Sequence, residues 1–206
     1  QASSGGPRRH QRPDIGEKYM SPTALVLGGG VSGLTCALRL LESGWRVHLL
    51  ARSLAAPLQQ QWLSPPKITS AGAGAIWEYP PYQVQPAVAA RRWALETLQD
   101  LTQLSINSEA TGVRIARVHA LFRSASGAAA AIAAEDGLAT LLPGFRGPSE
   151  AHGRYASAYS FDAPVAWMPR YLCWLRAECT ARGLVVSEGV SLKSLAEALD
   201  HSDVVP

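Results

Sequence analysis

Six residues near the start of the chain have the composition and spacing of a phosphate-binding turn. Residues 28–33 read Gly-Gly-Gly-Val-Ser-Gly and match the pattern G-x-G-x-x-G. In this pattern the first glycine, Gly28, permits a tight turn, and the second, Gly30, lets a diphosphate approach the main chain. The third, Gly33, lets a helix pack closely on a strand. The chemistry that these residues predict is the binding of a dinucleotide, with the anion at the positive end of the helix.

The flanking sequence supplies the elements that such a turn needs. Residues 24–27 are a short apolar run, which is typical of a strand buried on both faces of a parallel sheet. Over residues 31–43 the apolar side chains recur three and four positions apart, and this period predicts a helix. Residues 45–51 form a second apolar run. Strand, turn, helix and strand together have the length of one βαβ unit.

The residues after the second strand bear on which dinucleotide binds. Folds that bind NAD carry an acidic residue there, whereas this chain has Arg52 and Ser53. Arg52 could accept the extra phosphate of NADP, or it could lie against the adenosine half of FAD with Ser53 supplying a hydroxyl. A solvated arginine with no ligand is a third interpretation. These residues alone therefore leave open an NAD(P)-binding dehydrogenase, an FAD enzyme and a non-catalytic dinucleotide-binding module.

The rest of the chain alternates between helical and extended patterns. Helical spacing is found over residues 86–104, 169–182 and 192–199. Strand-like runs cover residues 113–122, 155–161, 184–187 and 203–205. Residues 124–136 are rich in alanine and predict a surface helix or an insertion. The irregular stretches 52–77 and 143–153 predict loops, and the length and small residues of the first favour a functional loop.

These elements predict an α/β fold built on a Rossmann-like, mostly parallel sheet with helices on both faces. Residues 1–22 are expected to be a disordered tail. Residues 23–112 and 162–206 are expected to form the two parts of the dinucleotide-binding domain. Residues 113–161 are expected to form part of a mixed α+β substrate domain, because strands follow one another there without alternating helices.

The overall composition excludes several classes of protein. A chain of 206 residues with 47% hydrophobic residues can bury a sizeable core, and no uninterrupted apolar run reaches the ~18 residues of a membrane span. The net charge of +3 comes from scattered basic residues, so no nucleic-acid partner is expected. Three separated cysteines predict neither a disulfide framework nor a metal site, and they indicate a reducing compartment.

Two further blocks of sequence resemble the D-amino-acid oxidase and D-aspartate oxidase family of flavoenzymes. The first block is residues 47–52 followed by residues 70–77, Ser-Ala-Gly-Ala-Gly-Ala-Ile-Trp. The second is residues 159–162 followed by residues 169–175, Pro-Arg-Tyr-Leu-Cys-Trp-Leu. The resemblance extends over residues 23–205 in the family's order. The chain departs from the family's pattern in two ways. The stretch between residues 47–52 and residues 70–77 is longer than in the family, and the chain stops before the family's next glycine-bearing turn.

The resemblance implies FAD as the cofactor. The residues expected to bind it are Gly28, Gly29, Gly30, Val31, Ser32, Gly33, Arg52, Ser53, Thr69, Ser70, Gly74, Ala75, Ile76 and Val190. A backbone of small residues in the second half of the loop can lie against the flavin ring and donate N–H groups to it. Trp77, which follows that backbone, is expected to pack in the core.

The resemblance also implies the reaction and the partners. In the family a hydride passes from Cα of a D-amino acid to the flavin, and O2 reoxidises the flavin and yields hydrogen peroxide. The family's substrate-binding residues come from its later half, so no catalytic residue is assigned in this chain. The chain is expected to be the N-terminal portion of a longer enzyme, inactive alone. The family is compatible with a homodimer and with a peroxisomal or cytoplasmic location.

Overall fold

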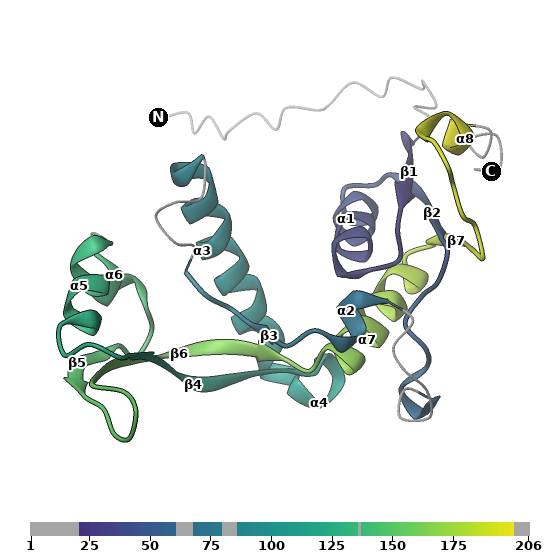
Figure 1. Cartoon of the computed structure of the whole chain (residues 1–206). Helices are drawn as coiled ribbons and strands as arrows, with labels where there is room; N and C mark the ends of the chain where they lie inside the picture. The colour runs from purple at the N-terminus through teal and green to yellow at the C-terminus, as the bar shows by residue number, and fades with distance from the viewer. Residues whose placement is uncertain (1–20, 61–67, 80–85, 136, 200–206) are drawn as a thin grey trace, which may run out of the picture.

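The computed structural model describes residues 21–60, 68–79, 86–135 and 137–199. Within them the chain forms two sheets, called sheet A and sheet B, which lie at different ends of the molecule (Figure 1). The predicted tail, apart from its last two residues, and the predicted strand 203–205 lie outside the described residues.

Sheet A is the parallel sheet that the sequence predicts. Its order is β1 (Thr23–Leu27), β2 (Arg46–Ala51) and β7 (Val185–Glu188), with β2 in the centre. Helix α1 (Val31–Glu42) connects β1 to β2, and helix α7 (Met168–Ala181) leads into β7. The first three elements begin and end close to their predicted positions, because a buried strand, a glycine turn and an amphipathic helix all leave local signals.

Both of these helices cover the same face of sheet A. Alternate residues of β2, Val47, Leu49 and Ala51, belong to one buried cluster with Leu34 of α1 and Leu172 of α7. The reason is the strand order. Each crossover steps the same way across the sheet, and right-handed crossovers in one direction place their helices on one face. The spacing of apolar residues shows that a helix has a buried side, but not which face of the sheet it covers.

Sheet B is antiparallel and is built around one long strand, β6 (Ser157–Ala166). On one edge β6 pairs with β4 (Val113–Phe122), and on the other with β3 (Ala75–Ile76) and β5 (Arg146–Glu150). In Figure 1, β4 and β6 run away from sheet A as a long ribbon, with β5 at its far end.

The strands of sheet B depart from the sequence prediction in three places. β3 and β5 lie inside stretches predicted to be loops, and β6 continues past residue 161, where the predicted strand ends. Pro164 argues against a strand interior because it has no N–H to donate. It nevertheless lies within β6, and its carbonyl accepts a hydrogen bond from the Trp77 N–H at 2.9 Å. Pairing with β6 is therefore what makes β3 and β5 strands.

The helices around sheet B include the longest one of the described chain, α3 (Ala87–Leu104). The alanine-rich segment forms α5 (Gly127–Ala134), so of its two predicted forms the structure shows the helix. A second buried cluster joins α3 and residues 138–142 to the sheet, and its members are Trp77, Leu98, Leu138, Leu142, Phe161 and Ala163. The shorter helical segments are η1 (Leu58–Gln60), α2 (Thr69–Gly72), η2 (Ser105–Asn107), α4 (Ser108–Thr111), α6 (Leu138–Leu141) and α8 (Leu195–Leu199).

Two further sequence expectations concern membranes and cysteines. Among the described residues, no helix combines the length and the hydropathy needed to cross a membrane. None of the three cysteines is in a disulfide: Cys36 is exposed, Cys173 is half-buried and Cys179 is buried. Burial raises the pKa of the Cys179 thiol to about 11, so this thiol stays protonated near neutral pH and acts as a small apolar side chain.

Candidate functional site

Four segments that are distant in sequence meet at the carboxyl edge of sheet A. They are the glycine turn after β1, the loop after β2, helix α2 and the residues after β7. The Gly28 N–H donates to the Leu50 carbonyl at 2.8 Å, and the Val190 N–H donates to the Ala51 carbonyl at 3.1 Å. Ligands of open α/β sheets bind at this edge, because all the parallel strands end there and their connecting loops enclose a crevice.

Two glycines of the turn have the conformational roles that the motif predicts. Gly28 has φ +105°, a backbone conformation that L side chains rarely adopt. At Gly33, the first atom of any side chain would overlap the carbonyl oxygen of Gly28. The strand and the helix can therefore come this close only because both residues are glycine.

The other two glycines differ from each other. Gly29 is buried against the loop after β2, where a Cβ would overlap the Leu54 side chain and lie 3.0 Å from the Ser53 carbonyl oxygen. Among the residues that the structure describes, a Cβ at Gly30 would meet just one atom within 4 Å, the Ser70 Oγ at 3.1 Å. Gly29 therefore serves packing, while Gly30 is the position whose missing side chain leaves the main chain approachable.

Ser70 connects helix α2 to the start of helix α1. Its Oγ accepts a hydrogen bond from the Val31 N–H at 3.1 Å, across 39 residues of sequence. The first four N–H groups of an α-helix have no partner within the helix, so Ser70 satisfies one of them. The first turn of α1 contains no acidic residue, and Ser32 there is exposed. The first turn of α1 itself therefore supplies no carboxylate to neutralise the positive end of the helix.

The loop after β2 is held by an acidic residue of the neighbouring strand. The Leu54 N–H donates to Glu188 Oε1 at 3.1 Å, and Glu188 is the last residue of β7. The sequence pattern predicts an acidic residue at the end of β2, where the chain has none. It does not point to an acidic residue at the end of the adjacent parallel strand. Arg52 is exposed and Ser53 half-buried at the same edge. The signal that could have identified Glu188 is its position immediately before Gly189, at the end of a predicted strand.

Residues 74–76 form the passage from sheet A to sheet B. Ala75 pairs with Ala166 and also packs against the core of sheet A, whereas Ile76 is 58% exposed. Successive side chains of a strand point to opposite faces. Trp77, the next residue, is 7% exposed and donates its indole N–H to the Ala94 carbonyl at 2.9 Å. The structure confirms that Trp77 is a core residue.

The structure thus brings most of the predicted cofactor-binding residues to one edge of sheet A. The others, residues 74–76, lie in the passage from sheet A to sheet B. Residues 28–33, Arg52, Ser53, Ser70 and Val190 surround the end of sheet A, and Thr69 begins α2 beside them. The N–H groups of Val31 and Val190 already donate within the protein. The main chain around Gly30, the Ser32 end of α1 and the exposed Arg52 remain accessible. A diphosphate anion fits this set, because it needs N–H donors, hydroxyls and positive charge. The Glu188 carboxylate at the same edge already accepts the Leu54 N–H.

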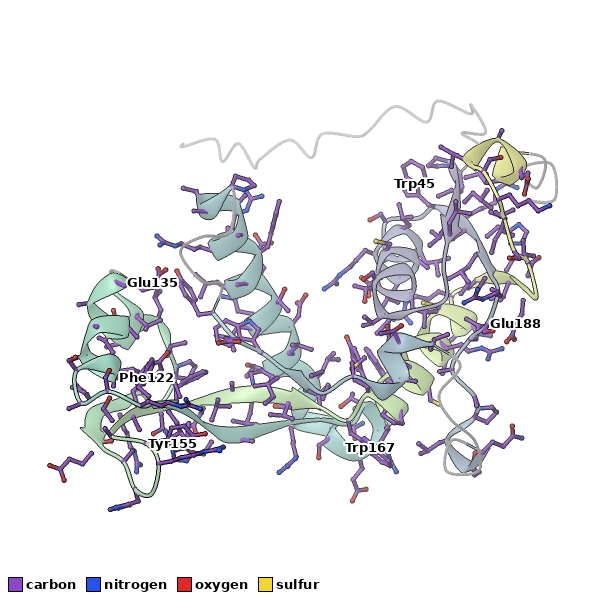
Figure 2. All side chains as sticks on the ribbon, in the orientation of Figure 1. Trp45, Phe122, Glu135, Tyr155, Trp167 and Glu188 are labelled. Atoms are coloured by element: carbon purple, nitrogen blue, oxygen red, sulfur yellow. The ribbon has the colours of Figure 1, made fainter. Side chains whose placement is uncertain are left out.

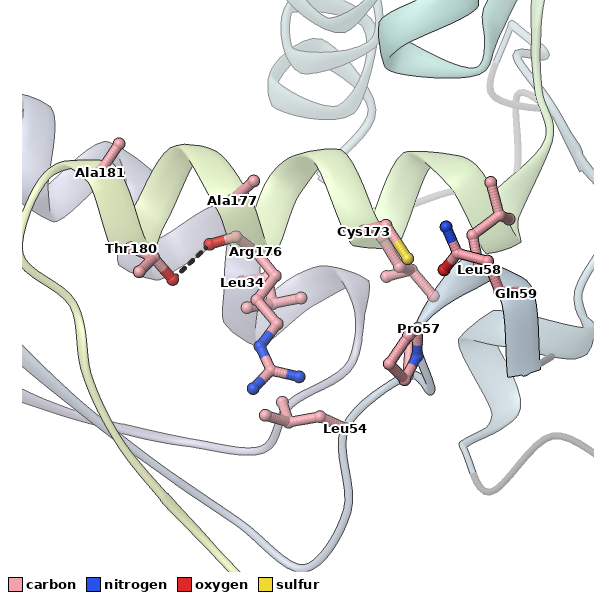
Figure 3. Close-up of a pocket in the computed structure, with 12 residues that line it drawn as sticks. Leu34, Leu54, Pro57, Leu58, Gln59, Cys173, Arg176, Ala177, Thr180 and Ala181 are labelled. Carbon is pink, nitrogen blue, oxygen red and sulfur yellow. Dashed lines mark hydrogen bonds between the residues drawn. The ribbon is translucent and has the colours of Figure 1, made fainter.

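A separate groove lies on the helix-covered side of the same region. It encloses about 660 Å3 between α1, the loop after β2 and α7, and Leu34, Leu54 and Leu172 form part of its apolar wall. Figure 3 shows Arg176 extending from α7 toward Leu54, with the Thr180 hydroxyl bonded to the Arg176 carbonyl at 2.9 Å. None of the predicted cofactor-binding residues lines this groove. Leu54 separates it from the glycine turn, since the same side chain packs against Gly29.

Comparison with known families identifies the class to which this site belongs. Residues 23–205 match the FAD dependent oxidoreductase family, DAO. The chain belongs to this family, and its cofactor is FAD. The match decides between the dinucleotides that Arg52 and Ser53 left open, and it confirms the resemblance that the sequence blocks indicated.

Two curated relatives are both named D-amino-acid oxidase. The one from Streptomyces coelicolor (strain ATCC BAA-471 / A3(2) / M145) is 33% identical over 174 residues, covering 84% of this chain and 48% of the relative. The one from Rubrobacter xylanophilus (strain DSM 9941 / JCM 11954 / NBRC 16129 / PRD-1) is 34% identical over 188 residues, covering 88% of this chain and 50% of the relative. The chain therefore spans about half the length of these relatives.

Solved structures with the same fold include oxidases and deaminases of amino acids. The glycine oxidase of Bacillus cereus ATCC 14579 has a TM-score of 0.56 at 18% identity, covering 82% of this chain and 46% of its own. An L-amino acid deaminase from Proteus vulgaris has a TM-score of 0.60 at 11% identity, covering 92% and 42%. At these identities the likeness shows the fold, a Rossmann-like domain with a mixed second domain.

Proposed function

We propose that the chain forms the FAD-binding part of an enzyme that oxidises D-amino acids. The names of both curated relatives support the D configuration of the substrate. The observation that carries the proposal is the open main chain at Gly30 beside the positive end of α1. Within the described part of the chain, an added Cβ there would meet a single atom within 4 Å, the Ser70 Oγ. This arrangement holds a diphosphate and leaves the rest of the edge for the two halves of the cofactor.

The chemistry divides between the cofactor and the protein. Bound FAD supplies the redox step, in which the substrate loses a hydride from Cα and O2 finally takes the electron pair to give hydrogen peroxide. The residues of this chain bind and orient the cofactor. The start of α1 attracts the diphosphate, and Arg52 and Ser53 lie at the edge where the adenosine half would extend. Residues 74–76 carry the backbone from that edge to sheet B, where the proposed substrate region begins.

The domain division is proposed on the same basis. Two separate buried clusters, one around sheet A and one around sheet B, support a division into a cofactor domain, predicted at 23–112 and 162–206, and a partial substrate domain, predicted at 113–161. Trp77 and Leu98 belong to the cluster of sheet B, so in this proposal the segment from Trp77 through α3 moves to the substrate domain. Strand β6 runs through position 161 without interruption. The boundary between 161 and 162 therefore shifts in this proposal to the start of α7. A homodimer and a cytoplasmic location are further proposals, and both curated relatives are bacterial proteins.

The first experiment measures retention of FAD by the full chain. The purified protein is incubated with excess FAD and desalted, and the flavin absorbance is compared with that of Gly30→Val and Thr35→Val. We expect the parent and Thr35→Val, a control one turn further along α1, to retain flavin. Gly30→Val should retain none, because its methyl groups occupy the approach to the main chain. Equal retention by Gly30→Val and the parent contradicts this placement of the diphosphate.

The second experiment measures substrate choice. The flavin-loaded chain is mixed without oxygen with D-alanine, L-alanine or glycine, and bleaching of the flavin absorbance is followed. The sequence predicts that this chain is inactive alone, so we expect either no bleaching or, where the chain does turn over, the fastest bleaching by D-alanine. Faster bleaching by L-alanine or glycine contradicts the D configuration, and bleaching by D-alanine contradicts the expected inactivity of the chain.

A further inference from the structure

A second cavity lies on the α3-covered side of sheet B, away from the edge that is proposed to hold FAD. It encloses about 310 Å3, and the side chains that matter most in its wall are Trp77, Glu78, Tyr79, Glu135, Tyr159 and Phe161. Figure 2 shows Glu135 and Glu188, which marks the FAD edge, at opposite ends of the molecule. Of the predicted FAD-binding residues, Ile76 alone contributes to this wall.

Aromatic rings form much of the wall. Trp77 and Tyr79 meet edge to face with ring centroids 6.5 Å apart. Tyr159 and Phe161 are stacked with centroids 6.2 Å apart on the opposing strand. The π faces of such rings attract organic cations, most strongly where water is excluded.

Glu135 adds a buried negative charge with unused hydrogen-bonding capacity. Its side chain is 9% exposed, and its Oε2 accepts a hydrogen bond from the Arg91 guanidinium at 2.6 Å. Its other oxygen, Oε1, is buried and has no hydrogen-bond partner within the described residues. A buried carboxylate oxygen without a donor is costly, so this atom is the place where a ligand N–H would be stabilised most.

Glu78 reinforces the charge of the cavity. The pKa of Tyr159 is raised above its ordinary value, first by burial and then by the negative charge of Glu78. The phenol therefore stays neutral near neutral pH, and the wall holds two carboxylates. The Arg91 guanidinium offsets one of them, and His119 is the histidine of the wall. With that imidazole neutral, the cavity keeps an excess of negative charge.

We propose that this cavity is a binding site for a small primary alkylammonium ion, whose N–H groups donate to Glu135 Oε1 while its carbon chain lies against the rings. The unpaired oxygen demands an N–H donor, so a primary ammonium suits it better than a quaternary one. The described residues contain no group of three or more His, Cys, Asp or Glu side chains arranged for a metal, and the aromatic walls favour an organic ion over a bare one.

The test is a calorimetric and NMR titration of the full chain with n-butylammonium chloride, and separately with 1-butanol. We expect butylammonium to bind with 1:1 stoichiometry and 1-butanol, which has the same length but no charge, to bind at least about tenfold more weakly. Glu135→Gln should weaken butylammonium binding by about tenfold or more. Glu150→Gln, which removes the same charge from an exposed position on β5, should leave it unchanged.

These outcomes distinguish an ammonium-binding site from a purely apolar cavity. Equal affinity for the alcohol and the ammonium ion, or the absence of saturable butylammonium binding, overturns it. So does a folded Glu135→Gln protein with the parent's affinity. If Glu135→Gln does not fold, Phe161→Leu keeps an apolar side chain of similar size without the ring, and unchanged binding by that variant also overturns the proposal. None of these measurements depends on oxidase activity or on FAD.

Discussion

Sheet A and sheet B differ in how their strands are covered and in what fills the space beside them. In sheet A the central strand is buried along most of its length, with Val47 1% and Ala51 3% exposed. In sheet B the long strand β4 keeps large apolar side chains in solvent, with Ile115 43% and Leu121 45% exposed. A parallel sheet buries its strands almost completely, whereas an antiparallel one can face solvent on one side.

The packing beside the two sheets differs as well. Next to sheet A the backbone packs on backbone, because Gly33 lets α1 touch the Gly28 carbonyl. Next to sheet B, large rings such as Trp77 and Phe161 fill the core and leave a cavity between them. Close backbone packing leaves main-chain N–H groups at the edge, which suits an anion. Ring packing leaves π faces and gaps, which suits a small organic cation.

The largest effect is expected from one methyl group added in the backbone-packed region beside sheet A. Gly33→Ala should lower the free energy of unfolding by about 3 kcal/mol, because the Cβ overlaps the Gly28 carbonyl oxygen and rigid backbone cannot move aside cheaply. The sign of this change in the free energy of unfolding is informative, since alanine in a helix interior otherwise stabilises the helix relative to glycine. Denaturant titration measures it, with Ser32→Ala as the control. A variant as stable as the parent contradicts the close contact.

A smaller effect is expected in the ring-packed region. Trp77→Phe should lower the free energy of unfolding by about 2 kcal/mol, because it leaves a gap and removes the hydrogen bond to the Ala94 carbonyl. Trp93→Phe, at a position 52% exposed on the same helix that Trp77 contacts, should cost less than about 0.5 kcal/mol. Equal losses in the two variants, measured by the same titration, would mean that Trp77 does not anchor this core.

The smallest effect is expected at Ser70, in helix α2, which precedes the passage from sheet A to sheet B. Ser70→Ala should cost about 1 kcal/mol of stability, because the Val31 N–H loses its acceptor at the start of α1. Ser70→Thr keeps a hydroxyl and should recover most of the loss. Thermal unfolding of the two variants in the absence of FAD checks this prediction. A Ser70→Ala protein with the parent's unfolding midpoint means that the hydrogen bond from the Val31 N–H to Ser70 does not stabilise α1.

The sequence predicted the elements whose signals are local. Residues 86–104 and 169–182 are helical to within one residue at each end, as α3 and α7, because an apolar face every three to four residues marks a long helix. Strand β3 has two residues and β5 contains Gly147 and Pro148. Their strand conformation comes from pairing with β6, so no pattern within either segment could indicate it.

The glycine turn follows from the order of the amino acids, because its requirements are a positive φ and missing side chains at fixed spacing, and both are properties of six consecutive residues. Three contacts follow only from the packing of the folded chain: Ser70 on the start of α1, Glu188 on the loop after β2, and Glu135 in the wall of the second cavity. Each joins segments far apart in the chain, and the distance between such segments depends on strand order and helix packing, which no local pattern contains.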